Sequence, residues 1–286
     1  MTSQDLAADA THSHIGVSIA RISPYVYAIR DFTDGLKQWR IWLLLAYQDI
    51  QLRYRRSVIG PFWLTLSMAI LVYSMGYLYA HLFHQNLTTY YPFLVTGMLS
   101  WTLISTIIME ISDGLIVAEG LIKNIKLSYF LHMHRIAMRN IIIFFHNILV
   151  LIPIFLIYSD NIKISRFSLL MFYGLALIYF NTLTFGMIVS MIGARYRDFS
   201  QVVKSLLQVI FFVTPIMWNP SVLGDKFKFI VIANPIYAFV EILRAPLLGT
   251  LPSGQCILMS FIMTLMGLVI CFLFFSKYRS RIIFWL

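Results

Sequence analysis

Charge, cysteine and nucleotide-binding motifs are scarce in this chain. Charged residues make up 12% of its 286 residues, about half the share that is usual in soluble domains. The sequence has no G-x-x-x-x-G-K-[ST] phosphate loop and no group of His, Cys, Asp and Glu at metal-ligand spacing. We therefore expect this chain to carry no catalytic residue, no metal site and no cofactor.

The two cysteines, Cys256 and Cys271, fall in one predicted helix. A helix would place them roughly 22 Å apart along its axis, whereas the Cα atoms of a disulfide lie about 4.4–6.8 Å apart. We expect both thiols to face lipid or the protein core, without a redox or metal role.

Apolar residues are abundant and make up 59% of the chain. Several stretches exceed the ~20 apolar residues that cross a bilayer as a helix, so the composition predicts an all-α polytopic membrane protein. A flexible cytoplasmic N-terminus (1–35) and an interfacial amphipathic helix with a basic entrance (36–60) precede a six-span domain (61–286). We expect the spans at about 62–83, 92–112, 138–158, 168–194, 201–217 and 255–276. The fifth span is short and ends at Thr214-Pro215.

Lysine and arginine together outnumber the acidic residues by 22 to 12. They flank the apolar spans instead of forming one face, which argues against nucleic acid as a partner. Most lie before span one, in the loop 113–137 with the adjoining end of span three, which together hold Arg135 and Arg139, around 195–204 and in the C-terminal tail. The exceptions, on the opposite side, are Lys163, Arg166, Lys226, Lys228 and Arg244. The positive-inside rule then places both termini in the cytoplasm.

Three arginines, Arg53, Arg55 and Arg56, lie just before the start of span one. One interpretation is purely topological, because positive charge holds the start of a span at the inner surface. The other adds contact with anionic lipid head groups or phosphate. Both interpretations stay open.

The segment before these arginines has the spacing of one helical face. The positions on that face are Trp39, Trp42, Leu43, Ala46, Tyr47 and Ile50. Polar residues such as Gln48 and Asp49 interrupt the segment too often for a membrane span, so it predicts a helix lying in the membrane interface. An ordinary cytosolic helix packed on a partner is the alternative.

Ionisable residues are rare within the spans, where a secondary transporter carries the groups that bind its coupling ion. Glu110 lies near the cytoplasmic end of span two, Asp113 just beyond it and His146 in span three, and they form no convincing relay. Transport by this chain would therefore take its energy from elsewhere. His132 and His134 fall in a short cytoplasmic loop, where we expect them to be solvated or to face a partner.

Aromatic residues are frequent inside the apolar stretches. They include Tyr73, Tyr77, Trp101, Tyr179 and Phe180. A flat ring with a hydroxyl or indole N–H suits contact with a sugar, but aromatic residues also serve as packing and as interface belts. Sugar contact along a channel and ordinary packing both fit the pattern.

The segment 218–254 is apolar but broken by Pro220, Pro235, Pro246 and Pro252. Two short helices that dip into the membrane and return fit this pattern, provided that the backbone breaks are buried in protein or line a cavity. Glu241 and Arg244 are three residues apart, so on a helix they share one face and can pair. An amphipathic loop outside the membrane is the alternative.

Four stretches of the chain together resemble the membrane subunit of type-2 ABC exporters, specifically those that export O-antigen, capsule or teichoic-acid polysaccharides. The stretches are DIQLRYRRSVIGPFWLTLSMAI (49–70), KLSYFLHMHRIAMRNIIIFFHN (126–147), GARYRDFSQVVKSLLQVIFFVTPIMW (193–218) and NPIYAFVEILRAPLLG (234–249). The resemblance covers roughly residues 36–286.

This resemblance implies a homodimer of six-span protomers in the bacterial inner membrane, with a channel between them. It also implies two copies of a separate ATP-binding subunit, which holds ATP and magnesium. A coupling helix at about 114–128, within the loop 113–137, would contact that subunit and transmit its conformational change to the membrane helices. Its implied contact residues are Glu119, Lys123, Asn124 and Lys126. Ser128 stands where the family often has proline, which leaves the end of the coupling helix open.

The resemblance further implies re-entrant gate helices at about 222–249 on the periplasmic side. The gate residues would be Pro235, Glu241, Arg244 and Pro246. The expected function is therefore that of a permease subunit moving lipid-linked polysaccharide outward, with Arg53, Arg55 and Arg56 guiding the lipid phosphate. The rival functions are export of a lipid or drug through the same fold and, less favoured, a membrane glycosyltransferase.

Overall fold

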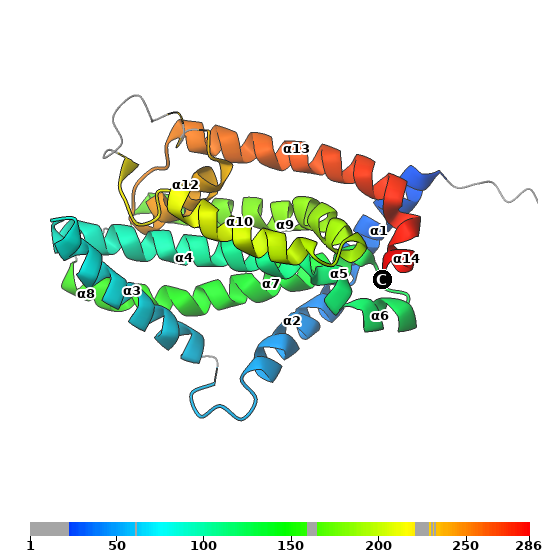
Figure 1. Ribbon diagram of the computed structural model, residues 1–286, viewed down its shortest axis with the longest axis horizontal. Coiled ribbons are helices and arrows are strands. Elements are labelled where there is room, and N and C mark those ends of the chain that lie inside the picture. The colour runs from blue at the N-terminus through cyan, green and yellow to red at the C-terminus, as the bar shows by residue number, and fades with distance from the viewer. Residues whose placement is uncertain (1–22, 61, 159–164, 221–228, 230, 232) are drawn as a thin grey trace, which may run out of the picture.

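The computed structural model describes residues 23–60, 62–158, 165–220, 229, 231 and 233–286. The described residues fold into helices joined by short connections, without a β-strand among them. Figure 1 shows α4, α7, α9 and α13 running along the long axis of the molecule, while α2 and α3 diverge from this bundle on one side. The predicted all-α class is confirmed.

Five helical stretches in the described part of the chain are long and apolar enough to cross a membrane. They are α3 (Phe62–Leu82), α4 (Leu87–Ser112), Tyr129–Ile157 with α7 (Tyr129–Asn147) and α8 (Leu151–Ile157), Arg166–Arg195 with α9 (Leu170–Arg195), and Gly254–Trp285 with α13 (Gly254–Tyr278) and α14 (Ile282–Trp285). The predicted fifth span corresponds to the shorter α10 (Phe199–Val213), which has 15 residues and is followed by its C-cap residue Thr214, close to the expected end at Thr214-Pro215. The chain is thus a multi-pass membrane protein.

Helix α4 forms the centre of the bundle. Most of its residues are buried, and it packs against α3, α7, α9, α10 and α12. A close approach between α4 and α9 depends on Gly193, because a Cβ atom there would come within 2.0 Å of the carbonyl oxygen of Ser112. Cys256 and Cys271 are free thiols, both buried on α13.

Helix α7 begins at Tyr129, well before the predicted start of span three at residue 138. Ser128, the residue that departs from the family pattern, caps α7 by accepting a hydrogen bond from the backbone N–H of Phe130. His132 and His134 are therefore buried within a helix, with 2% and 0% exposure, and the expectation that they lie in a loop, solvated or facing a partner, is wrong. The start of this helix was predicted too late because α7 carries arginines, whose charges are neutralised by carboxylates on other helices.

The N-terminal segment also departs from expectation. Residues 24–35, expected to be flexible, belong to helix α1 (Pro24–Lys37), which packs against α7 and α13. Asp31 is buried on α1, accepts hydrogen bonds from the Ser128 hydroxyl and the Tyr129 N–H, and pairs with Arg279. Because the Asp31 carboxylate has partners on two distant segments, it holds α1 against the bundle. The local sequence around Asp31 does not indicate these partners.

Helix α2 (Trp39–Arg53) occupies the predicted interfacial segment and packs along α7. The predicted face divides in two: Ala46 and Ile50 are buried, whereas Trp39 and Tyr47 are about half exposed. The exposed rings are suited to head-group depth, where aromatic side chains concentrate. Helix α2 thus combines a face against the bundle with an aromatic face away from it.

The predicted gate region contains one described helix, α12 (Pro235–Leu247), which is largely buried against α4, α9 and α13. Asn234 caps it by accepting hydrogen bonds from the N–H groups of Ile236 and Tyr237. The other predicted gate helix falls mostly on 221–228, outside the described residues. The described part is a helix packed inside the protein and not an amphipathic loop.

We expect Gly193→Ala to destabilise the protein, because its Cβ atom would force α9 away from the Ser112 carbonyl at 2.0 Å. The cost of such overpacking is about 1–3 kcal/mol, seen as a lower Tm of the purified protein. Gly120→Ala is the matched control, since Gly120 is also helical and has no atom within 4 Å of the added Cβ. Equal Tm values for the two variants would contradict this packing.

Candidate coupling and substrate-entrance site

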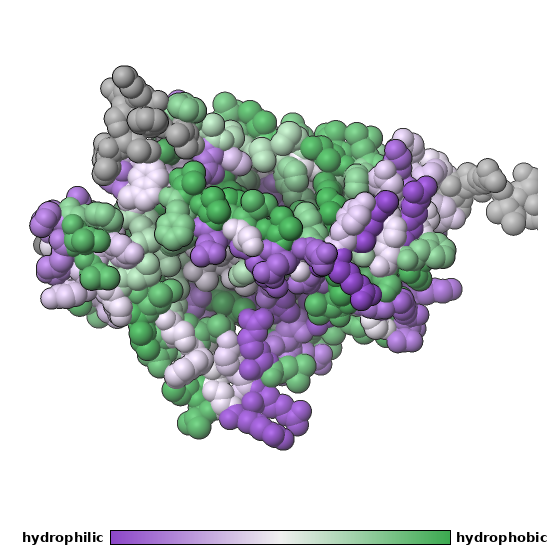
Figure 2. All heavy atoms as spheres, in the orientation of Figure 1, coloured by the Kyte–Doolittle hydropathy of each residue, from purple (hydrophilic) through white to green (hydrophobic). Residues whose placement is uncertain are grey.

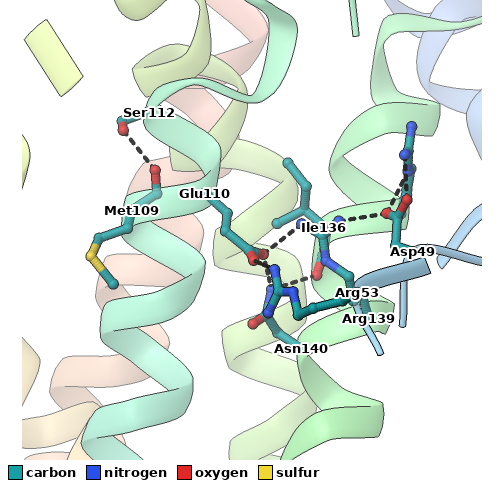
Figure 3. A network of polar contacts seen from close by, with 9 residues as sticks. Asp49, Arg53, Met109, Glu110, Ser112, Ile136, Arg139 and Asn140 are labelled. Carbon is teal, nitrogen blue, oxygen red and sulfur yellow. Dashed lines mark hydrogen bonds and ion pairs between the residues drawn. The ribbon is translucent and has the colours of Figure 1, made fainter. Parts of the chain in front are cut away.

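An ion network joins three helices at the level where α2 meets the bundle. Asp49 on α2 accepts hydrogen bonds from Arg135 on α7, with 2.8 Å between Nε and Oδ2, and from Arg139 one turn further along. Arg139 also donates to Glu110 on α4, with 2.7 Å between Nη2 and Oε2. Figure 3 shows Arg139 between the two carboxylates, so one guanidinium connects α2, α4 and α7.

Glu110 collects two further donors. The Arg53 Nη2 lies 3.2 Å from its Oε1, and the amide of Asn140 donates to its Oε2. Arg53 stands at the end of α2, so α2 contacts α4 through Arg53 as well as α7 through Asp49. The three helices are therefore held together by charge-assisted hydrogen bonds, which are stronger than neutral ones.

The network is mostly sheltered from water. Asp49, Glu110, Arg135 and Arg139 have side chains exposed by 13% to 18%. Burial alone raises the pKa of Asp49, but the hydrogen bonds and charges of Arg135 and Arg139 outweigh it and hold the pKa below its ordinary value of 3.8. Removing one partner of such a network leaves an uncompensated charge, which is costly.

Sequence reasoning missed this site. It placed Glu110 near the end of span two without a partner, counted Arg135 and Arg139 only as topological charges, and treated Asp49 as a polar interruption. A usable signal was present: Asp49 and Arg53, like Arg135 and Arg139, are four residues apart and so share a helical face. Charge within an apolar helix has to be paired, which pointed to contacts between these faces.

The three arginines expected to meet lipid phosphate are not equivalent. Arg53 takes part in the network, whereas Arg55 and Arg56 are exposed beyond the end of α2. Arg56 has a φ of 71°, in the left-handed region, within the turn that leads to α3. The structure thus brings one of the three into the site and leaves two at the surface.

The expected coupling segment forms two short helices, α5 (Gly114–Val117) and α6 (Glu119–Asn124), at the end of α4. Lys123 Nζ lies 2.6 Å from Glu119 Oε1, and this hydrogen bond lowers the pKa of Glu119. Asn124 donates to the carbonyl of Gly120, and Lys126 is exposed just beyond α6. Leu115 on α5 is tied to α9, because its N–H donates to the Ser190 hydroxyl at 2.9 Å.

The five aromatic residues expected along a channel lie in different surroundings. Tyr73 donates to the carbonyl of Val150 at 2.6 Å, and Tyr179 contacts the buried His134 through its hydroxyl. Trp101 is buried against Phe211 of α10, with 5.5 Å between ring centroids. Tyr77 and Phe180 are exposed. A single protomer does not bring these five rings onto one surface.

The predicted pair of Glu241 and Arg244 forms on α12, with 3.8 Å between Nη1 and Oε2. Arg244 is fully buried and does more than pair: its Nη2 donates to the carbonyls of Pro215 and Ile216, just beyond α10. Pro235 is the first residue of α12, and Pro246 lies within its last turn. Arg244 therefore fastens the expected gate helix to the segment that ends α10.

Residues 40–248 of the chain match the ABC-2 type transporter family. The chain belongs to this family. Over 247 residues it is 22% identical to an O-antigen export system permease protein, RfbA, of Klebsiella pneumoniae, which covers 84% of this chain and 92% of that protein. A protein of the same name from Myxococcus xanthus is 24% identical over 195 residues, covering 67% of this chain and 73% of the other. The resemblance to type-2 ABC exporters is confirmed.

Most of the site just described lies within the segment that matches the ABC-2 family. Asp49, Glu110, Arg139, the helices α5 and α6, and Arg244 all fall between residues 40 and 248. Figure 2 shows hydrophilic side chains gathered over the region of α2, α5 and α6, and hydrophobic ones over α13. In this ABC-2 protein the ion network thus borders the polar end of an apolar bundle.

We expect Asp49→Asn to lower Tm at neutral pH, because Arg135 and Arg139 lose the carboxylate between them. The folded-state pKa of Asp49 is depressed, so its contribution is present above the unfolded pKa and is lost as pH falls through the folded one. The difference in Tm between parent and variant should therefore shrink below about pH 4.

Asp34→Asn is the matched control, because the side chain of Asp34 is 45% exposed and its ion pair with Arg30 is 4.0 Å long. Its effect on Tm should be small at every pH, as expected for a surface pair. Thermal melts of the purified proteins between neutral and acid pH test both statements. A difference for Asp49→Asn that stays constant down to pH ~2 would contradict the assigned role of its charge.

Proposed function

We propose that this protein is the membrane subunit of an ATP-driven exporter that moves a lipid-linked polysaccharide, such as O-antigen or capsule, from the cytoplasmic to the outer side of the bacterial inner membrane. The observation that carries the proposal is the match to relatives named O-antigen export permeases over most of both chains, together with membership of the ABC-2 family. The chain itself acts without catalysis, and a separate ATP-binding subunit holds ATP and magnesium.

The functional unit in this proposal is a homodimer bound to two ATP-binding subunits, with both termini in the cytoplasm. Helix α10 supports a second copy, because its side away from the bundle is apolar. That side exposes Val202, Leu206, Val209, Phe212 and Val213. Helix α3 likewise buries few of its residues within one protomer. A path between two protomers would then lie along α3 and α10.

The contacts suggest how a displacement of α6 by the ATP-binding subunit would be transmitted to the membrane helices. Glu119, Lys123, Asn124 and Lys126 offer a polar surface to the ATP-binding subunit, and α5 passes displacement to α9 through Leu115 and Ser190. The ion network makes α2, α4 and α7 follow as a unit. Movement of this unit past α10 is the step that the proposal requires.

The outer gate responds to α10 through two links. Asn234, the cap of α12, donates to the hydroxyl of Thr214 at 2.9 Å, and Arg244 holds the carbonyls of Pro215 and Ile216. Because both links attach α12 to the end of α10, a shift of α10 would carry α12 with it. This coupling gives Pro235, Glu241, Arg244 and Pro246 their proposed role at the gate.

Depletion of the protein in its host tests the proposal directly. We expect completed lipid-linked polymer to accumulate on the cytoplasmic face and surface polysaccharide to fall, because synthesis continues while export stops. Fractionation of the glycan by membrane side provides the measurement. Normal surface glycan with an altered lipid profile or drug sensitivity would instead support a lipid or drug exporter of the same fold.

Replacement of an exposed aromatic residue tests the proposed glycan contacts. Tyr73 and Tyr179 make structural hydrogen bonds, so the exposed Phe180 is the better probe. We expect Phe180→Leu to reduce export several-fold, because the flat apolar ring on which a sugar would pack is lost.

Phe172→Leu is the matched control, since Phe172 is also exposed on α9. It should leave export of surface polysaccharide unchanged, with equal amounts of both variants in the membrane. Equal export by the Phe180 and Phe172 variants would remove Phe180 from the proposed path.

A further inference from the structure

The guanidinium group of Arg244 lies against helix α4 as well as against the segment that follows α10. Its Cζ atom lies 4.1 Å from the centroid of the Phe93 ring. Its Nη2 atom donates hydrogen bonds of 2.9 and 3.1 Å to the carbonyls of Pro215 and Ile216. Arg244 itself belongs to α12 and is 1% exposed. One buried side chain therefore joins α4, α12 and the end of α10.

Gly97 on α4 leaves the space that this guanidinium group occupies. A Cβ atom at Gly97 would lie 3.0 Å from Cζ of Arg244 and 3.0 Å from the oxygen of Ile216, and it would lie closer still to Nη2 of Arg244. Any side chain at this position would therefore displace the guanidinium group or the segment that follows α10. Phe93 and Gly97 are four residues apart, so they present one helical face to Arg244.

This face of α4 supplies a contact that the buried charge of Arg244 requires. Among the described residues, neither Nε nor Nη1 of Arg244 has a hydrogen-bond partner. The carboxylate of Glu241 lies 3.8 Å from Nη1, which is too far for a hydrogen bond. A buried charge is costly unless it is compensated, and the face of an aromatic ring attracts a desolvated cation. The Phe93 ring thus compensates part of the charge that the two carbonyls leave unpaired.

We infer that Phe93 and Gly97 are positioning residues for the proposed outer gate, because they hold the Arg244 guanidinium group of α12 against the carbonyls that follow α10. The same helix carries Glu110 of the ion network, roughly 20 Å further along its axis. Helix α4 therefore contacts the network near one end and Arg244 near the other. That α12 acts as a gate rests on the proposed function, whereas the placement of Arg244 does not.

These contacts predict how α12 responds when α4 moves relative to α10. The hydrogen bonds keep Arg244 with the carbonyls that follow α10, so a displacement of α4 would separate the guanidinium group from Phe93 and Gly97. Helix α12 would then be held less firmly against α4 and against α13, on which it also packs. The position of α12 thus depends on that of α4 and, through Glu110, on the ion network.

A native cysteine reports the position of α12. Cys256 lies in the first turn of α13, the helix that packs against α12, and is 7% exposed. The one other cysteine of the chain, Cys271, is removed by Cys271→Ser. Labelling of Cys256 by a membrane-impermeant maleimide is then measured on spheroplasts that contain the full-length protein. We expect labelling to be several-fold faster in Gly97→Ala and Phe93→Leu, because local opening around α12 costs less free energy.

Matched variants separate this effect from general packing. Gly186→Ala adds a Cβ atom at another buried helical glycine, where the nearest atom is at the ordinary distance of 3.4 Å. Phe167→Leu removes a ring that carries the exposed Arg166, with 5.2 Å between Cζ and the ring centroid. Neither should change the labelling of Cys256. Phe93→Tyr keeps the ring and should be labelled as slowly as the parent.

A double-mutant cycle tests whether Gly97 acts through Arg244. In Arg244→Lys the Nη2 atom that the added Cβ would meet is absent, so Gly97→Ala should accelerate labelling much less in this background than in the parent. An effect of equal size in both backgrounds would overturn the inference, as would unchanged labelling in Gly97→Ala and Phe93→Leu. If Gly97→Ala does not reach the membrane, the comparison of Phe93→Leu with Phe93→Tyr decides.

Export of surface polysaccharide is measured in the same variants, at equal amounts of protein in the membrane. We expect Phe93→Leu to lower export and Phe93→Tyr to preserve it. Faster labelling of Phe93→Leu with normal export would reject the positioning role at the gate and leave the proposed function standing. The labelling cycle does not depend on export, so normal surface glycan after depletion of the protein would reject the proposed function and leave the link between Gly97 and Arg244 in place.

Discussion

The bundle depends on the neutralisation of charge within apolar helices. Arg135 and Arg139 stand inside a helical stretch that is otherwise apolar enough to cross a membrane, and unpaired charges there would be costly. Asp49 and Glu110 supply the compensating carboxylates from α2 and α4. Because Arg139 is bonded to both, α2 cannot leave the bundle, and α4 cannot slide along α7, without exposing a charge.

This constraint holds α2, α4 and α7 together next to the short helices α5 and α6, for which a coupling role is proposed. Helices α5 and α6 follow α4 in the chain, and α5 also packs against α7 and α9, so a force applied to them would reach both the network and α9. The proposed gate has a parallel arrangement, in which the buried Arg244 fixes α12 to the carbonyls that follow α10. Buried arginines thus set the connections at both ends of the proposed transport path, while apolar packing fills the length between them.

The differences between expectation and structure follow from the same cause. The spans were placed by apolar length, which located α3, α9 and α13 closely and the short α10 correctly. The prediction failed at α7, where the arginines led to a predicted start at residue 138 although the helix begins at Tyr129. It also failed at α1, whose Asp31 is neutralised by Arg279 from the far end of the sequence. A local pattern cannot reveal that a charge has a partner 248 positions away.

The sequence by itself determined the membrane class, the approximate spans, the free cysteines, the shared face of Glu241 and Arg244, and the transporter family, because each depends on residues close together in the chain or on whole stretches of it. Only the tertiary structure decided which charges meet. It buried His132 beside Arg139, kept Arg53 in the site while leaving Arg55 and Arg56 outside, and separated the expected channel aromatics. These outcomes depend on how distant helices pack, since a charge or ring acquires its role from the partners that packing brings to it.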